Sequence, residues 1–121
     1  MYSIQNGTYT NIGANASSTL PTLSCSSAGN QEDVWFTAIV PENGNLVIET
    51  VPLDSNGLAD MAIQAYIGEN CTALVEVACN DNADANSTHA RIELIGETPG
   101  VEVYFRVVSN SLTQGNFGIC A

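Results

Sequence analysis

The densest group of oxygen-bearing side chains lies in residues 80–86, NDNADAN, directly after Cys79. Calcium takes about six to eight oxygen ligands, from carboxylates, amides and backbone carbonyls, and this loop is rich in such oxygens. The glycine and glutamate of an EF-hand loop are missing at the expected positions. We therefore predict a different type of calcium site, completed by acidic residues at the heads of two strands; the alternative is a solvated turn whose side chains cap their own backbone. The predicted ligands are Asp33, Asp60, Asn80, Asp81 and Asp84.

A second candidate site involves aromatic side chains. Trp35 and Phe36 are adjacent, so a strand would send them to opposite faces, and only one of them can join the main core. If Trp35 is exposed, it could stack on a sugar ring together with Tyr66 or Tyr104, which makes these three the candidate ligand-binding residues. The alternative, which we favour, is that residues 13–31 cover Trp35.

Signatures of catalysis are missing from the sequence. The single histidine, His89, stands beside Ser87 and Thr88, but no GxSxG motif surrounds a serine and no glycine-rich phosphate loop occurs. We predict that His89 is a surface or turn residue and that the chain is not an enzyme.

Four cysteines, Cys25, Cys71, Cys79 and Cys120, lack the CxxC spacing of zinc ribbons and thioredoxin-like sites. We predict two disulfides and, among the three possible pairings, favour Cys71–Cys79 with Cys25–Cys120. Disulfides indicate an oxidising compartment and therefore a secreted or cell-surface protein. The alternative is four buried thiols in a cytosolic protein.

The charge balance excludes some partners. The 121 residues include 13 acidic and 2 basic ones, a net charge of -11. Nucleic acid and anionic lipid would be repelled by this charge. No run approaches the roughly 18 apolar residues of a membrane span, and the first ten residues lack the regions of a signal peptide. We expect neither nucleic-acid binding nor membrane insertion.

The elements that must position these residues are strands. Short β-branched and aromatic runs alternate with turn residues, without a helical period between them, which predicts an all-β antiparallel sandwich or barrel. We expect a single domain over residues 1–121, in which residues 1–31 form a leading strand and a long polar connection. Turns are expected at 41–44 and 98–100, and a hairpin at 113–116. The expected strands are 8–12, 33–40, 45–52, 60–67, 72–79, 88–95, 101–109 and 115–120.

The order of these motifs resembles a known family. The segments DVWFTAIVPENG, LADMAIQAYIGENCTALVEVACNDNAD, IELIGETPGVEVYFRVVS and GNFGICA look like the bacterial pre-peptidase C-terminal domain, in the form common in secreted multidomain proteins of the Bacteroidetes. The resemblance covers about residues 20–121 and is most specific between Asp60 and Asp81. It implies a jelly-roll-like sandwich of about eight strands. The same stretch is distantly similar to CUB domains, whose calcium site uses acidic residues at comparable strand ends; here these are Asp33, Asp60 and Asp81.

The resemblance also implies a role. Such domains are mostly non-catalytic accessory modules of secreted proteases, glycoside hydrolases or adhesins, and some bind calcium, collagen or polysaccharide. We therefore expect a calcium-stabilised accessory domain that aids attachment or substrate targeting. Its expected partners are a polysaccharide or an extracellular protein, and neighbouring domains of the same chain. The alternatives are a carbohydrate-binding module and a protein-binding adhesin module, which would show an exposed apolar patch or a free sheet edge.

Overall fold

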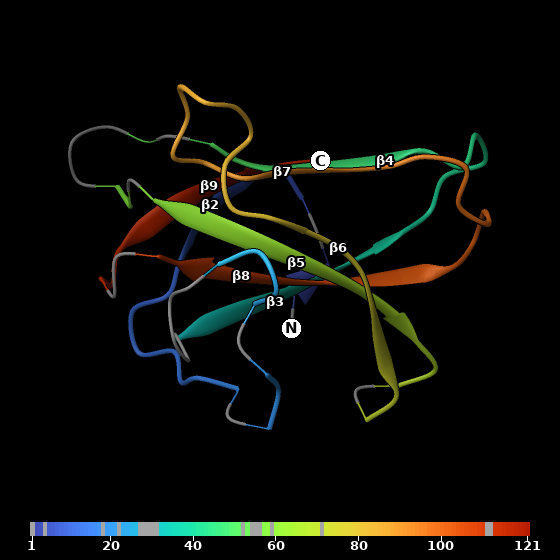
Figure 1. Cartoon of the computed structure of the whole chain (residues 1–121), viewed down its shortest axis with the longest axis horizontal. Helices are drawn as coiled ribbons and strands as arrows, with labels where there is room; N and C mark the ends of the chain where they lie inside the picture. Colours follow the sequence, from blue (N-terminus) through green and yellow to red (C-terminus); the bar gives the residue numbers. More distant parts are fainter. Residues whose placement is uncertain are drawn as a thin grey trace.

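The fold is a sandwich of two β-sheets (Figure 1). The computed structural model describes residues 2–3, 5–17, 19–21, 23–26, 32–51, 53, 57–58, 60–70, 72–110 and 113–121. In spatial order, the first sheet contains β1 (Tyr2–Ser3), β3 (Asp33–Ile39), β8 (Glu102–Ser109), β5 (Met61–Gly68) and β6 (Leu74–Asn80). The second contains β2 (Gly7–Thr10), β9 (Asn116–Cys120), β4 (Leu46–Val51) and β7 (Arg91–Leu94).

The predicted all-β antiparallel sandwich is confirmed, because each of the eight predicted runs overlaps an observed strand. β1 was not predicted; it pairs in parallel with β3, and a two-residue strand is too short to show alternation in the sequence. Within the described residues, no helix is long and apolar enough to cross a membrane.

Alternation along the strands builds the core between the sheets. In β5, Met61, Ile63 and Ala65 face the second sheet, while Gln64 and Tyr66 lie on the opposite face. Three fully buried phenylalanines, Phe36, Phe105 and Phe117, fill the centre.

Two predicted turns are confirmed and the predicted hairpin is wrong. Gly44 N donates to Pro41 O at 2.9 Å, and Gly44 has a φ of 75° that favours glycine. Residues 113–116, in contrast, connect β8 in one sheet to β9 in the other. The buried Asn11 holds this crossing, because its Oδ1 accepts from Gly115 N at 2.8 Å.

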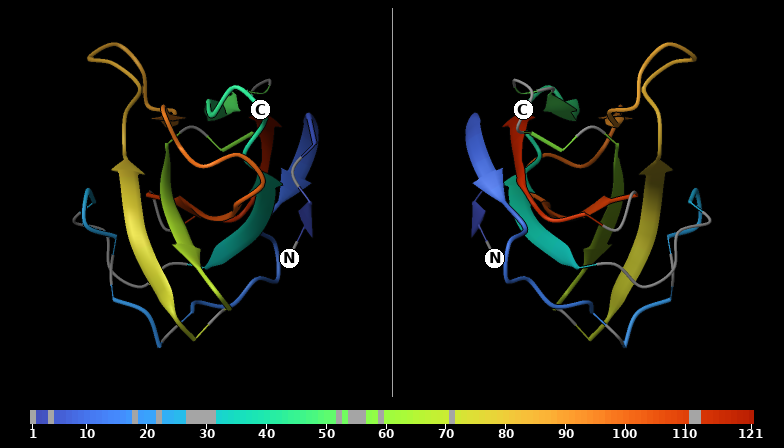
Figure 2. Two further views of the ribbon diagram at one scale, coloured as in Figure 1. Left: turned by 90° about the vertical axis from the view of Figure 1, so that its right-hand side faces the viewer. Right: turned by 90° about the vertical axis from the view of Figure 1, so that its left-hand side faces the viewer.

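Residues 13–17, 19–21 and 23–26, which we call the strap, cross the outer face of the first sheet, the face turned away from the second sheet. Contacts of the strap progress across the sheet: Ser17 binds Asp33 of β3, Pro21 binds Arg106 of β8, and Ser24 binds Glu76 of β6. Figure 2 shows this segment running outside the strands. The strap, which is the described part of the polar connection predicted for the first 31 residues, therefore covers one sheet.

A disulfide between Cys25 and Cys79 fastens the strap to β6, with the two Cα atoms 5.6 Å apart. Both predicted pairings, Cys71–Cys79 and Cys25–Cys120, are therefore wrong. Cys120 carries a free thiol in β9 of the other sheet, and Cys71 lies outside the described residues. The predictions rested on positions along the chain, whereas the strap carries Cys25 across the sheet to the edge strand.

Candidate functional site

Two of the predicted calcium ligands, Asp60 and Asp81, lie together at one end of the first sheet; we call them the acidic pair. β5 begins just after Asp60, and the antiparallel β6 ends just before Asp81, so the sheet itself brings them together. β8 ends beside the start of β5, and the next residue, Asn110, bridges the pair. Its Nδ2 donates to Asp60 Oδ1 at 3.3 Å and to Asp81 Oδ1. Ser26 of the strap donates to Asn110 Oδ1 at 2.6 Å.

The electrostatics of the acidic pair favour neutralisation. Burial raises the pKa of Asp81 above its ordinary value, the negative charge of Asp60 raises it further, and the hydrogen bond from Asn110 opposes the rise. In the described part of the chain, the ion pairs involve Arg91 and Arg106 and reach neither member of the pair. Two like charges therefore face each other, and bringing a cation between them would lower their repulsion.

The other three predicted ligands have different partners. Asp33 is held in a buried ion pair with Arg106. Asn80 Oδ1 accepts from Arg91 N at 2.9 Å, and the exposed Asp84 accepts from Asn86 N at 2.7 Å within its own loop. Asp84 thus follows the alternative prediction for this loop, a turn that caps its own backbone. The structure does not bring these three side chains to the acidic pair.

The donor set at the acidic pair fits part of a calcium site. Among the described residues, no group of three or more His, Cys, Asp and Glu side chains has metal-binding geometry. Asn110 lies outside that set of residue types, and rotating its amide by 180° would turn Oδ1 toward both carboxylates. Asp60, Asp81 and Asn110 would then offer three oxygen ligands from three strand ends, and the remaining ligands would be backbone carbonyls or water.

The buried ion pair of Asp33 and Arg106 is the second polar cluster, beneath the strap. Arg106 Nε donates to Asp33 Oδ2 at 2.7 Å, and Nη1 donates to Pro21 O at 2.9 Å. Ser17 Oγ and Trp35 Nε1 donate to Asp33 Oδ1 at 2.9 and 3.2 Å. Arg106 is completely buried because the strap covers the outer face of the first sheet. This cluster positions the strap.

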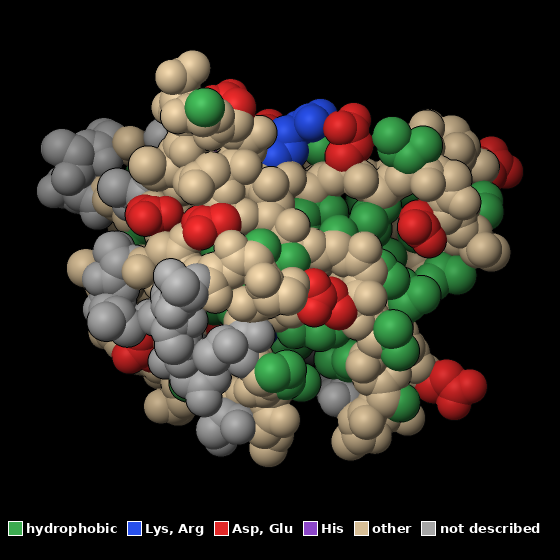
Figure 3. Space-filling model, viewed as in Figure 1, with side chains coloured by type: hydrophobic (Ala, Val, Ile, Leu, Met, Phe, Trp, Pro, Cys, Tyr) green, Lys and Arg blue, Asp and Glu red, His purple; other side chains and the backbone are tan. Residues whose placement is uncertain are grey.

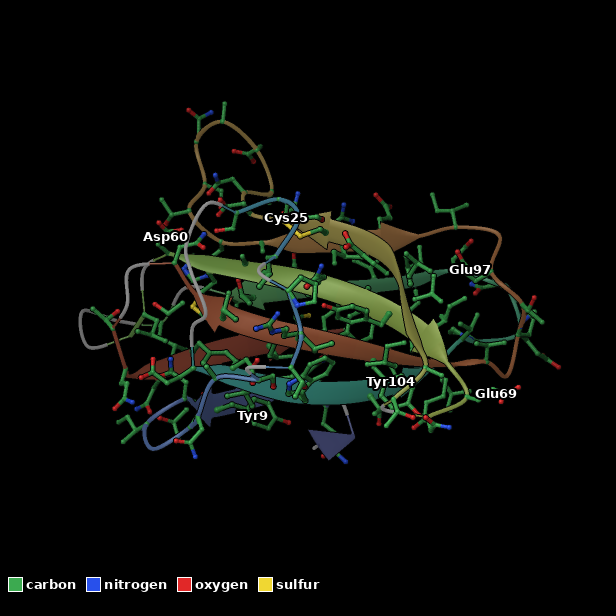
Figure 4. All side chains as sticks on the ribbon, turned by 60° about the horizontal axis from the view of Figure 1, so that its bottom comes forward. Tyr9, Cys25, Asp60, Glu69, Glu97 and Tyr104 are labelled. Atoms are coloured by element: carbon green, nitrogen blue, oxygen red, sulfur yellow. A yellow bond between two sulfur atoms is a disulfide. The ribbon has the colours of Figure 1, made fainter. Side chains whose placement is uncertain are left out.

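The aromatic candidates lie on the same outer face. Trp35 stacks on Tyr66, with ring centroids 5.6 Å apart and planes at 30°. Tyr66 is only 4% exposed, and burial raises its pKa, opposed by the neighbouring Arg106. Tyr104 is partly exposed and lies at the end of the sheet opposite Asp60 (Figure 4). Trp35 is partly exposed and lines a cavity of about 380 Å³ with Thr10, Ile12 and Ala14.

His89 is buried, so the predicted surface position is wrong, whereas the alternative turn position agrees with the bend in which it lies, just before β7. Its Nδ1 lies 3.1 Å from Thr50 Oγ1 of β4, and burial lowers its pKa below the ordinary value, opposed by the charge of Asp60. The loop before β7 folds inward at this point, where Ala90 N donates to the same threonine hydroxyl at 3.0 Å.

Several residues of these clusters were not predicted, among them Asn110, Ser26 and Arg106. Asn110 directly follows a predicted strand, and Asp81 likewise stands just after one. This shared position at a strand end is the signal that could have identified Asn110. Nothing in the sequence indicates which strand ends meet or where the strap crosses.

Comparison with solved structures identifies the fold. The pre-peptidase C-terminal domain of a collagenase from Bacillus anthracis superimposes with a TM-score of 0.56 and 13% sequence identity, over 98% of this chain and 89% of that domain. The two chains share a fold. No protein-family model matches the sequence, and no characterised protein matches it significantly. The likeness thus supports the predicted type of sandwich.

Proposed function

We propose that this chain is a non-catalytic accessory domain of a secreted multidomain protein, stabilised by calcium and aiding attachment or substrate targeting. The convergence of Asp60, Asp81 and Asn110 at one sheet end carries the proposal, because these strand ends offer oxygen donors and an unneutralised pair of charges. The shared fold supports the accessory role, and the Cys25–Cys79 disulfide supports an oxidising, extracellular setting.

Thermal unfolding with calcium and with a chelator tests the metal. A bound ion raises stability by RT ln(1 + [Ca²⁺]/Kd), so a Kd of about one hundredth of the calcium concentration gives about 2.7 kcal/mol. We expect the unfolding midpoint to rise with millimolar calcium and to return when the chelator is added. An unchanged midpoint would contradict the proposed calcium site, but it would not bear on the accessory role.

Two matched variants locate the ion. Asp81→Asn removes one carboxylate of the acidic pair, so we expect the calcium response to disappear while stability without calcium rises, because repulsion with Asp60 is relieved. Asp84→Asn makes the same charge change on the exposed part of the loop. We expect it to keep the calcium response, and equal losses in both variants would argue for diffuse charge attraction.

A carbohydrate-binding role is the second candidate, favoured by the cavity of about 380 Å³ beside Trp35. An aromatic wall and a partly apolar lining suit the face of a sugar ring. A glycan array followed by titration tests it: Trp35→Ala is expected to abolish binding, whereas Tyr104→Ala is expected to leave binding unchanged, because Tyr104 does not line the cavity. A blank array would remove this candidate.

A further inference from the structure

Within the described ranges, the edge strand β6 has a strand partner on only one side of its backbone. β6 is last in the spatial order of its sheet, beyond β5, and Figure 2 shows it at the margin of the sandwich. In the described residues, no hydrogen bond outside the strand ladders joins the β6 backbone to another backbone segment. An edge with free N–H and C=O groups can pair with an added strand.

Apolar side chains accompany this free edge. Val75 pairs across the sheet with Ile67, which packs against the core, so both side chains lie on the face turned toward the second sheet. Yet Val75 is 64% exposed, and Val77 is 36% exposed. The second sheet therefore does not cover this end of β6. We call the region between β6 and β7, where Ile67, Val75 and Val77 expose apolar surface, the β6 groove.

Figures 1 and 3 show why the groove is open. β6 and β7 meet at Asn80 and Arg91, where Asn80 Oδ1 accepts from Arg91 N, and from there the two strands diverge. Apolar side chains gather between them in the space-filling view, bordered by acidic side chains (Figure 3). Glu69 and Glu97 lie at the same end of the molecule, on the β5–β6 turn and the loop after β7 (Figure 4).

The charges beside β6 indicate which kind of strand could bind there. Glu76 of β6 is exposed on the outer face of the sheet, where its carboxylate accepts from Gln64 Nε2 at 2.8 Å and from Ser24 Oγ of the strap, while Val75 lies on the inner face. A strand added beside β6 would therefore meet an acidic side chain on one face and an apolar one on the other. A second copy of the chain, with a net charge of -11 and its own Glu76, would be repelled.

We propose that the β6 groove binds an extended segment of a protein partner as an additional strand, in which apolar residues alternate with lysine or arginine. The apolar residues contact Val75 and Ile67 on the inner face, and the basic residues contact Glu76 on the outer face. This inference deepens, and rests on, the attachment role proposed above by giving it a class of partner. It is independent of the calcium site, which lies at the opposite end of β5.

Fluorescence anisotropy with synthetic peptides of about nine residues tests the proposal. We expect an alternating Val-Lys peptide to bind at least about tenfold more tightly than a Val-Glu peptide and than a Val-Lys peptide with a central proline, which cannot form a complete ladder. Added NaCl should weaken binding, because charge attraction contributes. Equal binding of the basic and acidic peptides, or no binding of either at millimolar concentration, would overturn the proposal.

Two exposed residues provide matched variants. Val75→Lys places a charge in the groove and is expected to weaken Val-Lys binding by about tenfold or more. Ile12→Lys makes the same kind of change at a side chain that is also 64% exposed but lies on the turn after β2, so binding should stay within about twofold. Equal losses of peptide affinity in the two variants would contradict binding at the β6 groove.

Two further measurements separate the alternatives. Analytical ultracentrifugation is expected to find a monomer; a dimer that Val75→Lys dissociates would assign the groove to a second copy and overturn the proposal. Repeating the peptide titration with chelator is expected to leave the affinity unchanged. Absent peptide binding in a chain that calcium still stabilises would refute this inference alone, whereas peptide binding without a calcium response would refute the metal alone.

Discussion

Arg106 is the residue on which the outer face of the first sheet depends. Its guanidinium, completely buried, joins Asp33 of β3 to the backbone of the strap. Removing one partner of a buried ion pair leaves an uncompensated charge, which costs about 3 to 5 kcal/mol. We therefore expect Arg106→Met and Asp33→Asn each to lower the free energy of unfolding, measured in urea, by about that amount.

The other arginine in the chain is the control for this prediction. Arg91 pairs with Glu93 at 3.0 Å on the surface, and its side chain is 41% exposed. Exposed ion pairs contribute about 1 kcal/mol or less, so Arg91→Met should have a small effect. The double variant Asp33→Asn with Arg106→Met should lose less than the sum of the single losses, because neither charge then remains buried alone. A loss from Arg106→Met as small as that from Arg91→Met would contradict the role of the pair.

We expect His89 to make the stability of the chain depend on pH. Burial lowers the pKa of His89 in the folded chain below its ordinary value of about 6.5. When the pH falls below about 6.5, the unfolded chain therefore binds a proton at His89 more readily than the folded chain does. The contribution of His89 is fully present above about pH 6.5 and is lost as the pH falls through this window. Denaturant unfolding across this range should show stability falling with acidification.

Two variants separate His89 from the acidic pair in this measurement. His89→Gln is expected to flatten the pH dependence in that window. Asp81 acts with the opposite sign, because its pKa is raised in the folded chain; its contribution is lost as the pH rises above about 3.8. Asp81→Asn should therefore leave the decline near pH 6 in place. An unchanged slope in His89→Gln would contradict the assignment.

At the scale of elements, the strap depends on the Cys25–Cys79 disulfide. The bond spans 54 residues, and the chain-entropy relation for such a loop gives about 4 kcal/mol of stabilisation. We expect the double variant Cys25→Ser with Cys79→Ser to lose about 2 to 5 kcal/mol and to release the amides of the strap to faster hydrogen exchange. Cys120→Ser, which breaks no disulfide among the described residues, should lose much less. Slow exchange in the strap of the double variant would show that Arg106 alone retains it.

The strands other than β1 could be predicted from the sequence, and their assembly could not. Alternation is local, so the sequence alone is enough to place residues such as Met61, Ile63 and Ala65 on one common face. Partners across the sheet depend on the order of strands in space. The 113–116 hairpin failed because β8 and β9 belong to different sheets, and the bridge by Asn110 was missed because only sheet order places the end of β8 beside Asp60.

For the whole molecule, the two-sheet arrangement separates the proposed sites. β5 begins after Asp60 and ends before Glu69, so the acidic pair and the open end of the β6 groove lie at opposite ends of one strand. The strap lies between them on the outer face, fastened by Cys25 and Arg106. An ion at one end and a polypeptide at the other can therefore bind together without contact between the ligands.

The net charge of -11 predicts how the whole molecule responds to salt. Arg106 is buried with Asp33, so Arg91 is the arginine that faces outward, and the acidic side chains repel one another across the surface. The Debye length falls from about 30 Å at 0.01 M salt to about 3 Å at 1 M, so salt screens this repulsion. The repulsion is larger in the compact folded chain than in the unfolded chain, so its screening stabilises the folded chain. We expect the urea midpoint to rise with NaCl in the wild-type chain and in Asp81→Asn alike. Calcium added at constant ionic strength should stabilise the wild-type chain but not Asp81→Asn. A urea midpoint that falls with NaCl would contradict the prediction, because attractive surface pairs would then outweigh the repulsion.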